Sequence, residues 1–258
     1  EISECLVGSE MCIRDRDIDS YLVKVLEQMH ITLNNGLSSE GYLPGRLHVK
    51  KKAKEFYQKY LSNPTRESLV YAYALANSEE NASGNIVVTA PTCGSCAVVP
   101  AVLLSFQKNN NVSGEKIIEA LMVAGIIGNI VKTNASISGA EVGCQGEIGV
   151  ACSMASAALT YLENGDNYDI EYAGEVALEH HLGMTCDPVD GMVQIPCIER
   201  NAVAAMQAYN VASYVKLAGH NHNITLDSVI QVMNETGKDM HTKYRETSTG
   251  GLAIHKRG

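Results

Sequence analysis

Ser-Gly-Ala-Glu-Val-Gly-Cys-Gln-Gly-Glu (138–147) and Cys-Asp-Pro-Val-Asp-Gly-Met-Val-Gln-Ile-Pro-Cys (186–197) are two segments rich in glycine, proline and cysteine. Glycine and proline interrupt regular structure, so both segments are predicted to be loops. Small and aliphatic residues recur at helical spacing on either side of them, which predicts helices. We therefore expect a mostly α fold, a single compact helical domain whose cysteine-bearing loops lie between helices.

Working outward, apolar side chains at helical spacing predict a helix that begins near residue 18 and stops at Asn34-Asn35-Gly36. Asn63-Pro64 is predicted to start a helix that reaches Asn77, while Ser113 and Thr225 are predicted N-caps of two later helices. Further helices are expected at about 50–61, 97–107, 147–163, 169–182 and around 202–209. The apolar run 86–90 predicts a brief strand or an extended lead into the next loop.

Residues 1–16 contain Cys5 and Cys12 but show no clear periodicity or cap. We expect this segment to be a disordered lead, or a stretch foreign to the family, and we expect the catalytic domain to span residues 17–258.

The net charge of −9 argues against nucleic-acid binding, because phosphates require a basic surface. The exception is a basic cluster that we interpret as a solvated helix face: Arg46, Lys50, Lys51, Lys52 and Lys54. No apolar run reaches the ~20 residues that a membrane helix needs. The first residues do not resemble a secretory signal, so we predict a cytoplasmic location. Eight cysteines in that compartment are expected to be metal ligands or buried thiols rather than disulfides.

Cys186 and Cys197 lie beside Pro188 and Pro196, whose fixed φ stiffens the backbone that would aim a thiolate at a metal. Spacing alone does not separate metal ligands from two buried structural thiols. Cys144, in its glycine-rich turn, is equally ambiguous when taken alone.

Cys93-Gly94-Ser95-Cys96 is a tighter pair that could be a redox dithiol or half of a zinc site. No second pair completes a zinc ligand set, and no βαβ pattern supports a thioredoxin-like site. Cys152 is expected in the core. The histidines at 180, 181, 220 and 222 are expected to be exposed or hydrogen-bonded.

Five longer strings are more specific. They are Ala-Pro-Thr-Cys-Gly-Ser-Cys-Ala-Val-Val-Pro-Ala (90–101), Ser-Gly-Ala-Glu-Val-Gly-Cys-Gln-Gly-Glu-Ile-Gly-Val-Ala-Cys-Ser-Met-Ala (138–155), Glu-His-His-Leu-Gly-Met-Thr-Cys-Asp-Pro-Val-Asp-Gly (179–191), Gln-Ile-Pro-Cys-Ile-Glu-Arg-Asn (194–201) and Lys-Tyr-Arg-Glu-Thr-Ser-Thr-Gly-Gly-Leu-Ala (243–253). Together they resemble the α subunit of iron–sulfur-dependent L-serine dehydratase (L-serine ammonia-lyase) over roughly residues 17–258.

The resemblance implies a lyase of amino-acid degradation and gluconeogenesis that converts L-serine to pyruvate and ammonia. It implies a [4Fe–4S] cluster held by Cys144, Cys186 and Cys197, and it implies that Cys93, Cys96 and Cys152 are not ligands. It also implies a β subunit, or a fused β domain, that carries a Ser-Ser-His-type motif. This chain has no such motif, so we expect the catalytic base to come from the β subunit and name none here.

To hold L-serine for the elimination of water, the site needs hydrogen-bond donors for the substrate carboxylate and a group that binds the substrate ammonium. The loop Thr92, Gly94 and Ser95 precedes a predicted helix, whose N-terminus favours anions. A second wall is predicted from Lys243, Thr247, Ser248, Gly250 and Gly251. Ser138 is a further predicted substrate residue. Glu141 and Glu147 flank Cys144, and either could meet the ammonium or serve as a hydrogen-bond partner of the ligands.

Three alternatives remain open. A related iron–sulfur L-cysteine desulfidase would share the same site. A pyridoxal phosphate dehydratase would need a Ser-x-Lys segment beside a glycine-rich phosphate loop, which we do not find. A non-catalytic zinc or thiol-switch module would use Cys93 and Cys96.

Overall fold

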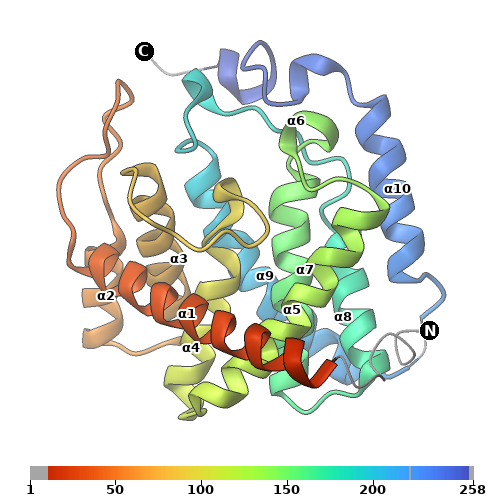
Figure 1. The fold of residues 1–258 in the computed structure, drawn as a ribbon. Helices are drawn as coiled ribbons and strands as arrows, with labels where there is room; N and C mark the ends of the chain where they lie inside the picture. The colour runs from red at the N-terminus through yellow and green to blue at the C-terminus, as the bar shows by residue number, and fades with distance from the viewer. Residues whose placement is uncertain (1–10, 221, 256–258) are drawn as a thin grey trace.

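Helix α7 (Val150–Leu162) lies at the centre of the molecule, and nearly all of its residues are buried. It packs against α4 (Val98–Asn110), α5 (Gly114–Asn134), α8 (Asn167–Glu179) and α9 (Cys197–Ala218), as Figure 1 shows. Alanine and serine dominate α7, and such small side chains let neighbouring helices approach closely. Ser153 on α7 donates a hydrogen bond to the Gly174 carbonyl of α8, at 2.7 Å.

The computed structural model describes residues 11–220 and 222–255, with side chains from residue 18 onward. The remaining α-helices are α1 (Met11–Ser38), α2 (Ala53–Ser62), α3 (Arg66–Ala82), α6 (Gly139–Val142) and α10 (Leu226–Asp239). Over the described ranges there is no strand beyond two isolated β-bridges. The prediction of a mostly α single domain is confirmed.

The predicted helix end at Asn34-Asn35-Gly36 is wrong, because α1 continues to Ser38. Gly36 lies directly against the backbone of Ala76 on α3, and a Cβ at position 36 would overlap the Ala76 carbonyl. The glycine therefore serves a close helix crossing here rather than a helix stop.

Of the predicted lead, residues 1–16, residues 1–10 lie outside the described part of the chain, and residues 11–16 form the first turns of α1. The predicted boundary after residue 16 stays a prediction.

Local signals at helix starts give a mixed result. Asn63-Pro64 is not the start of α3: Thr65 is the N-cap, and its side chain accepts from the Ser68 N–H at 3.1 Å. The Asn63 N–H instead bonds to the last turn of α2. Ser113 and Thr225 cap α5 and α10 as predicted.

Helix α3 also runs past its predicted end at Asn77. The extension carries the buried Glu79, whose carboxylate accepts hydrogen bonds from the Lys52 and Ala53 N–H groups, at 2.6 and 3.3 Å. An acid from α3 thus satisfies the free N–H groups at the start of α2. A long-range contact of this kind has no counterpart in local helix signals.

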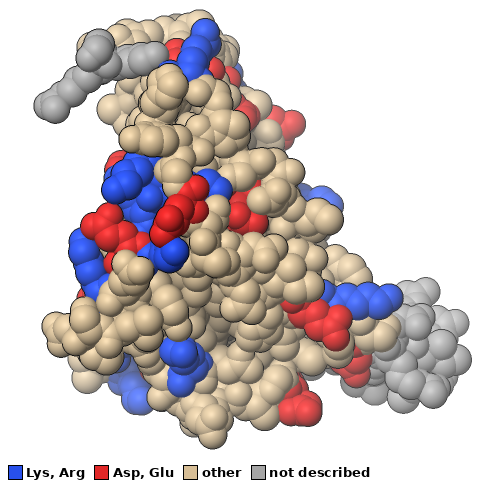
Figure 2. All heavy atoms as spheres, turned by 90° about the vertical axis from the view of Figure 1, so that its left-hand side faces the viewer, with Lys and Arg blue, Asp and Glu red and all other residues tan. Residues whose placement is uncertain are grey.

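Lysine and glutamate side chains alternate on the face that includes α2, which Figure 2 shows. Lys54 pairs with Glu40 at 2.5 Å, and Lys59 pairs with Glu55 at 3.1 Å along the helix. The basic cluster faces solvent in large part, but its assignment to a helix is wrong, because only Lys54 lies in α2 and the other four residues precede Ala53. Among the described helices, none combines the length and apolarity that crossing a bilayer requires.

The segment that follows α10 runs along the loop between α8 and α9, at the top of the view in Figure 1. We call residues 241–255 the C-terminal strap. The Cys186 N–H bonds to the Tyr244 carbonyl at 2.8 Å, and the Glu246 N–H bonds to the Cys186 carbonyl at 2.6 Å. The Ser248 hydroxyl donates to the Pro188 carbonyl at 2.9 Å. The strap therefore binds the backbone of the cysteine loop at Cys186, through both its N–H and its carbonyl, and at Pro188.

Candidate metal centre

Of the three cysteines singled out in the sequence, Cys144 and Cys197 lie at or beside helix starts, and Cys186 lies in a loop. Cys144 directly precedes a π-helical turn, η3 (Gln145–Gly149), that leads into α7. Cys197 is the first residue of α9, and Cys186 lies in the loop after α8, held by the strap. N-terminal helix ends carry partial positive charge, which favours thiolates over thiols.

The Cys144 and Cys186 thiols come together with the Glu147 carboxylate, their ligand atoms all within 4.8 Å of one another. The Cys186 sulfur lies 3.7 Å from Glu147 Oε2. Cys197 is close enough for the charge of Cys144 to raise the pKa of its thiol. Two thiols and a carboxylate at this separation could hold a metal ion.

The charge balance of the site favours a thiolate at Cys144. The Cys186 thiol donates a hydrogen bond to Cys144 and, helped by the positive charge of Arg200, holds the pKa of Cys144 below its usual range against the effect of burial. The same hydrogen bond, together with burial, raises the pKa of Cys186. Burial raises the pKa of Cys197 to about 12. Of the three thiols, Cys144 is therefore the one whose surroundings lower its pKa.

Glu147 points into this site from the first turn of η3. Its Oε1 accepts a hydrogen bond from the Thr92 hydroxyl at 2.7 Å, and burial raises its pKa. Gly139 leaves the space for it, since a Cβ at position 139 would lie 2.7 Å from Glu147 Oε2 and 2.9 Å from the Cys186 sulfur. A larger residue at 139 would displace both groups.

A buried ion pair supports the cysteine loop. Arg200 on α9 donates to the Thr185 carbonyl at 2.6 Å and to Asp187 Oδ1 at 3.0 Å. The other oxygen of Asp187 accepts from the Leu252 N–H of the strap at 2.7 Å. One carboxylate thus joins α9, the Cys186 loop and the strap.

Asn201, one helical turn after Cys197, ties the loop at 92–97 to α9. Its amide donates to the carbonyls of Gly94 and Cys197 at 2.7 and 2.9 Å. Its oxygen accepts from the Ala97 N–H at 3.1 Å. Sequence reasoning assigned no role to Asn201, Arg200, Asp187 or Gly139, although all four lie in the strings that carried the family resemblance.

The predicted substrate residues of the first loop divide into two groups. Thr92 and Gly94 lie against Glu147. Ser95 is buried, and its hydroxyl accepts from the Thr92 N–H at 3.3 Å. The loop forms a short 3₁₀ turn, η2 (Cys93–Ser95), before α4.

The other predicted substrate residues are more exposed. Ser138 is the residue before α6, and its N–H bonds to the Ser136 hydroxyl. The Glu141 side chain is exposed, while its N–H donates to the Ser138 carbonyl at 3.1 Å and its carbonyl accepts from Arg245 at 3.2 Å. On the strap, Lys243 lies over the Tyr244 ring and the Thr247 hydroxyl bonds to Thr242 and Thr249, while Ser248 holds Pro188. The structure thus brings Glu147, rather than Glu141, to the cysteines.

Three other cysteines lie among the residues whose side chains are described. Cys93 is exposed, Cys96 is buried, and Cys152 is fully buried within α7 as predicted. Among the described residues, no group able to hold a metal includes Cys93 or Cys96. Burial raises the pKa of Cys96 to about 12, which disfavours a reactive thiolate there.

A family model described as "Serine dehydratase alpha chain" matches residues 2–253. The chain belongs to this family. Its curated relatives include the L-serine dehydratase of Haemophilus influenzae, 45% identical, L-serine dehydratase TdcG of Escherichia coli, 48% identical, and the L-serine dehydratase of Mycobacterium tuberculosis, 46% identical. Each alignment covers 98% of this chain and 58% of the relative.

This member of the serine dehydratase α-chain family therefore spans less than three fifths of the length of the relatives it matches. The resemblance drawn from the five strings is confirmed at the level of the family. The family match begins at residue 2, and it includes most of the segment that sequence reasoning set apart as a lead.

Proposed function

We propose that this chain forms the metal-bearing part of an L-serine ammonia-lyase, which eliminates water from L-serine to give pyruvate and ammonia. One observation carries the proposal. Cys144 and Cys186, from separate segments, meet the half-buried Glu147, and Cys197 lies near enough to feel the charge of Cys144, in a chain that is 45–48% identical to proteins named L-serine dehydratase. We place the enzyme in the cytoplasm, where its many free thiols would stay reduced.

The resident group we propose is a [4Fe–4S] cluster held by Cys144, Cys186 and Cys197. The donor set fits, because cluster ligands are thiolates, Arg200 adds positive charge beside Cys144, and the missing side chain of Gly139 lets the Cys186 sulfur and the Glu147 carboxylate lie side by side. With three cysteines for four irons, a bound cluster supplies a Lewis acid for the substrate hydroxyl, as open metal sites do.

The residues of this chain bind and orient the amino acid beside that group. Thr92 and Gly94 form one wall, where Thr92 already donates to Glu147. We assign the substrate ammonium to Glu147, which faces the cysteines, in preference to the exposed Glu141. The strap residues Lys243, Thr247 and Ser248 remain candidates for the opposite wall, close to the substrate carboxylate.

The base that removes the Cα proton is proposed to come from the β portion of the enzyme, as a separate subunit or a fused domain. Within residues 18–220 and 222–255, no histidine contact reaches the three cysteines or Glu147. The relatives are longer than this chain, which leaves room for such a portion.

The ligand assignment is tested by anaerobic reconstitution followed by iron and sulfide analysis. We expect close to four irons and four sulfides per chain for the wild type, and a large loss for Cys144→Ser, Cys186→Ser and Cys197→Ser. Cys93→Ser is the matched control, because Cys93 is an exposed cysteine outside the proposed set. Loss of metal in the control instead would support a zinc or thiol-switch module.

The substrate is tested by anaerobic pyruvate release from the complex with the β portion. We expect faster release from L-serine than from L-cysteine. A strong preference for L-cysteine would make the protein a desulfidase. We also expect exposure to air to abolish turnover before the fold is lost, and full turnover by an iron-depleted enzyme would refute the mechanism.

A further inference from the structure

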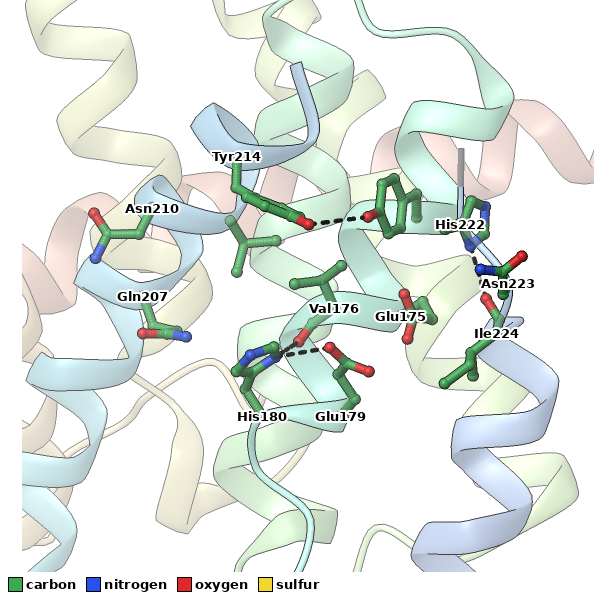
Figure 3. A pocket seen from close by; sticks show the side chains of 12 residues that line it. Glu175, Val176, Glu179, His180, Gln207, Asn210, Tyr214, His222, Asn223 and Ile224 are labelled. Atoms are coloured by element: carbon green, nitrogen blue, oxygen red, sulfur yellow. Dashed lines mark hydrogen bonds and ion pairs between the residues drawn. The ribbon is translucent and has the colours of Figure 1, made fainter. Parts of the chain in front are cut away.

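A cavity lies on the side of α8 that faces α9 and the loop before α10, and none of its lining residues belongs to the candidate metal centre. Its volume is about 590 Å³, which is within the ~300–1,000 Å³ range of small-molecule sites. Figure 3 shows that its lining comes from α8, α9 and the segment at 222–224. Three elements distant in sequence therefore form one concave site.

The notable group in this cavity is the carboxyl of Glu175. Its side chain is only 2% exposed, and its Oε1 atom has no hydrogen-bond partner within the described part of the chain. A buried polar atom without a hydrogen-bond partner is costly. Glu175 lines the cavity, so a ligand bound there could supply the missing partner.

A second carboxyl lies beside it. Glu179, one helical turn later, lies close enough for its charge to raise the pKa of Glu175, and Figure 3 shows Glu179 also reaching His180. Burial raises the pKa of Glu175 to about 8, and the charge of Glu179 adds to this effect. Two adjacent acids in a partly enclosed site favour a positively charged ligand.

The walls next to these acids are aromatic. Tyr172 stacks on the His222 ring with centroids 4.1 Å apart, and its hydroxyl donates to that of Tyr214 at 3.4 Å. Aromatic faces attract organic cations, and Val176 and Val211 add apolar surface for an alkyl group. The lining includes no lysine or arginine, so an anionic group finds no strong partner here.

We propose that this cavity binds a small organic cation, a protonated primary amine without a carboxylate, whose ammonium meets the Glu175–Glu179 pair. Its alkyl part lies between the tyrosines and the valines. An amino acid such as L-serine is disfavoured, because its carboxylate would face two acids. A metal ion is also disfavoured, since the groups of described residues able to hold one do not include Glu175 or Glu179.

The test uses n-butylammonium chloride as the probe and n-butanol as its neutral analogue, at constant ionic strength. Binding to the metal-free 258-residue chain is measured by calorimetry and by saturation-transfer NMR. We expect a dissociation constant of about 1 mM for the amine, given the ligand efficiency of so small a molecule, and binding at least tenfold weaker for the alcohol. Because no cluster is needed, the outcome is independent of the proposed lyase activity.

Glu175→Gln keeps the shape of the side chain but cannot ionise to pair with the bound ammonium, so we expect it to weaken amine binding at least tenfold. Glu27→Gln, an exposed glutamate on α1, is the control and should bind as the wild type does. Circular dichroism checks the fold of each variant, and Glu179→Gln gives an independent reading, with a smaller loss expected. Equal affinity of the amine for the wild type and both pocket variants, or equal affinity for amine and alcohol, would overturn the proposal.

Discussion

Replacing Asp187 with alanine should destabilise the chain more than the loss of any surface charge. The Asp187 side chain is 3% exposed and the Arg200 side chain 17% exposed. The substitution leaves the guanidinium of Arg200 without its carboxylate and frees the Leu252 N–H of the strap. We expect both the Cys186 loop and the strap to loosen.

The expected loss of stability follows from the contacts that Arg200 and the Leu252 N–H keep once the Asp187 carboxylate is gone. Removing one member of a buried ion pair costs about 3–5 kcal/mol. Arg200 keeps its bond to the Thr185 carbonyl and some access to water, so the lower end applies. The lost bond to the Leu252 N–H adds about 1 kcal/mol at most, because water can replace it. We expect a loss of about 3–4 kcal/mol for Asp187→Ala and about 1–2 kcal/mol for Asp187→Asn, which keeps one acceptor oxygen.

The assay is urea unfolding of the metal-free chain at neutral pH, followed by circular dichroism, so that metal loss does not contribute. A shift of the midpoint with an unchanged slope reports the stability difference. Hydrogen exchange of the Leu252 amide should accelerate in the same variant. If Asp187→Ala unfolds within about 0.5 kcal/mol of the wild type, the usual range for surface changes, the ion pair does not hold these segments together.

Three further predictions concern glycines and a buried acid. Gly139→Ala places a Cβ between the Glu147 and Cys186 side chains, so iron loading should fall at least severalfold while stability changes little. The control is Gly125→Ala, whose Cβ meets nothing within 4 Å and which should bind iron normally. Equal iron loading of both variants would contradict the site. Gly36→Ala should destabilise the chain by about 2 kcal/mol or more in urea unfolding, because overlap with the α3 backbone outweighs the ~1 kcal/mol gain in helix propensity; a more stable variant would refute the close crossing. Glu175 has a raised folded-state pKa, so the folded protein binds more protons than the unfolded one from about pH 4.5 to about pH 8 and loses stability as pH rises through that window. Glu175→Gln removes this loss, so its stability advantage over the wild type should grow steadily as pH rises through the window; a pH-independent difference would refute the assignment.

The helical class of this protein and its helix caps at Ser113 and Thr225 were predictable from the sequence, because apolar periodicity and capping act over a few residues. The same local rules failed at Asn63-Pro64, where Thr65 three residues before Ser68 forms a better cap. They also failed at Gly36, where packing against α3 overrides the stop signal. Such contacts join segments that are far apart in the chain, and no local pattern encodes them.

For the candidate site, the sequence by itself determined which residue types are available: three cysteines in glycine- and proline-rich segments, within strings typical of one family. Only the tertiary structure decided which polar groups share a volume with them. It turned Glu147 inward and left Glu141 in solvent, and it joined Arg200 and Leu252 through Asp187. It also buried Glu175 in a cavity formed by three elements. Side-chain chemistry is a property of each residue, whereas burial and proximity arise only when helices pack, and these set the charge and reactivity of the groups.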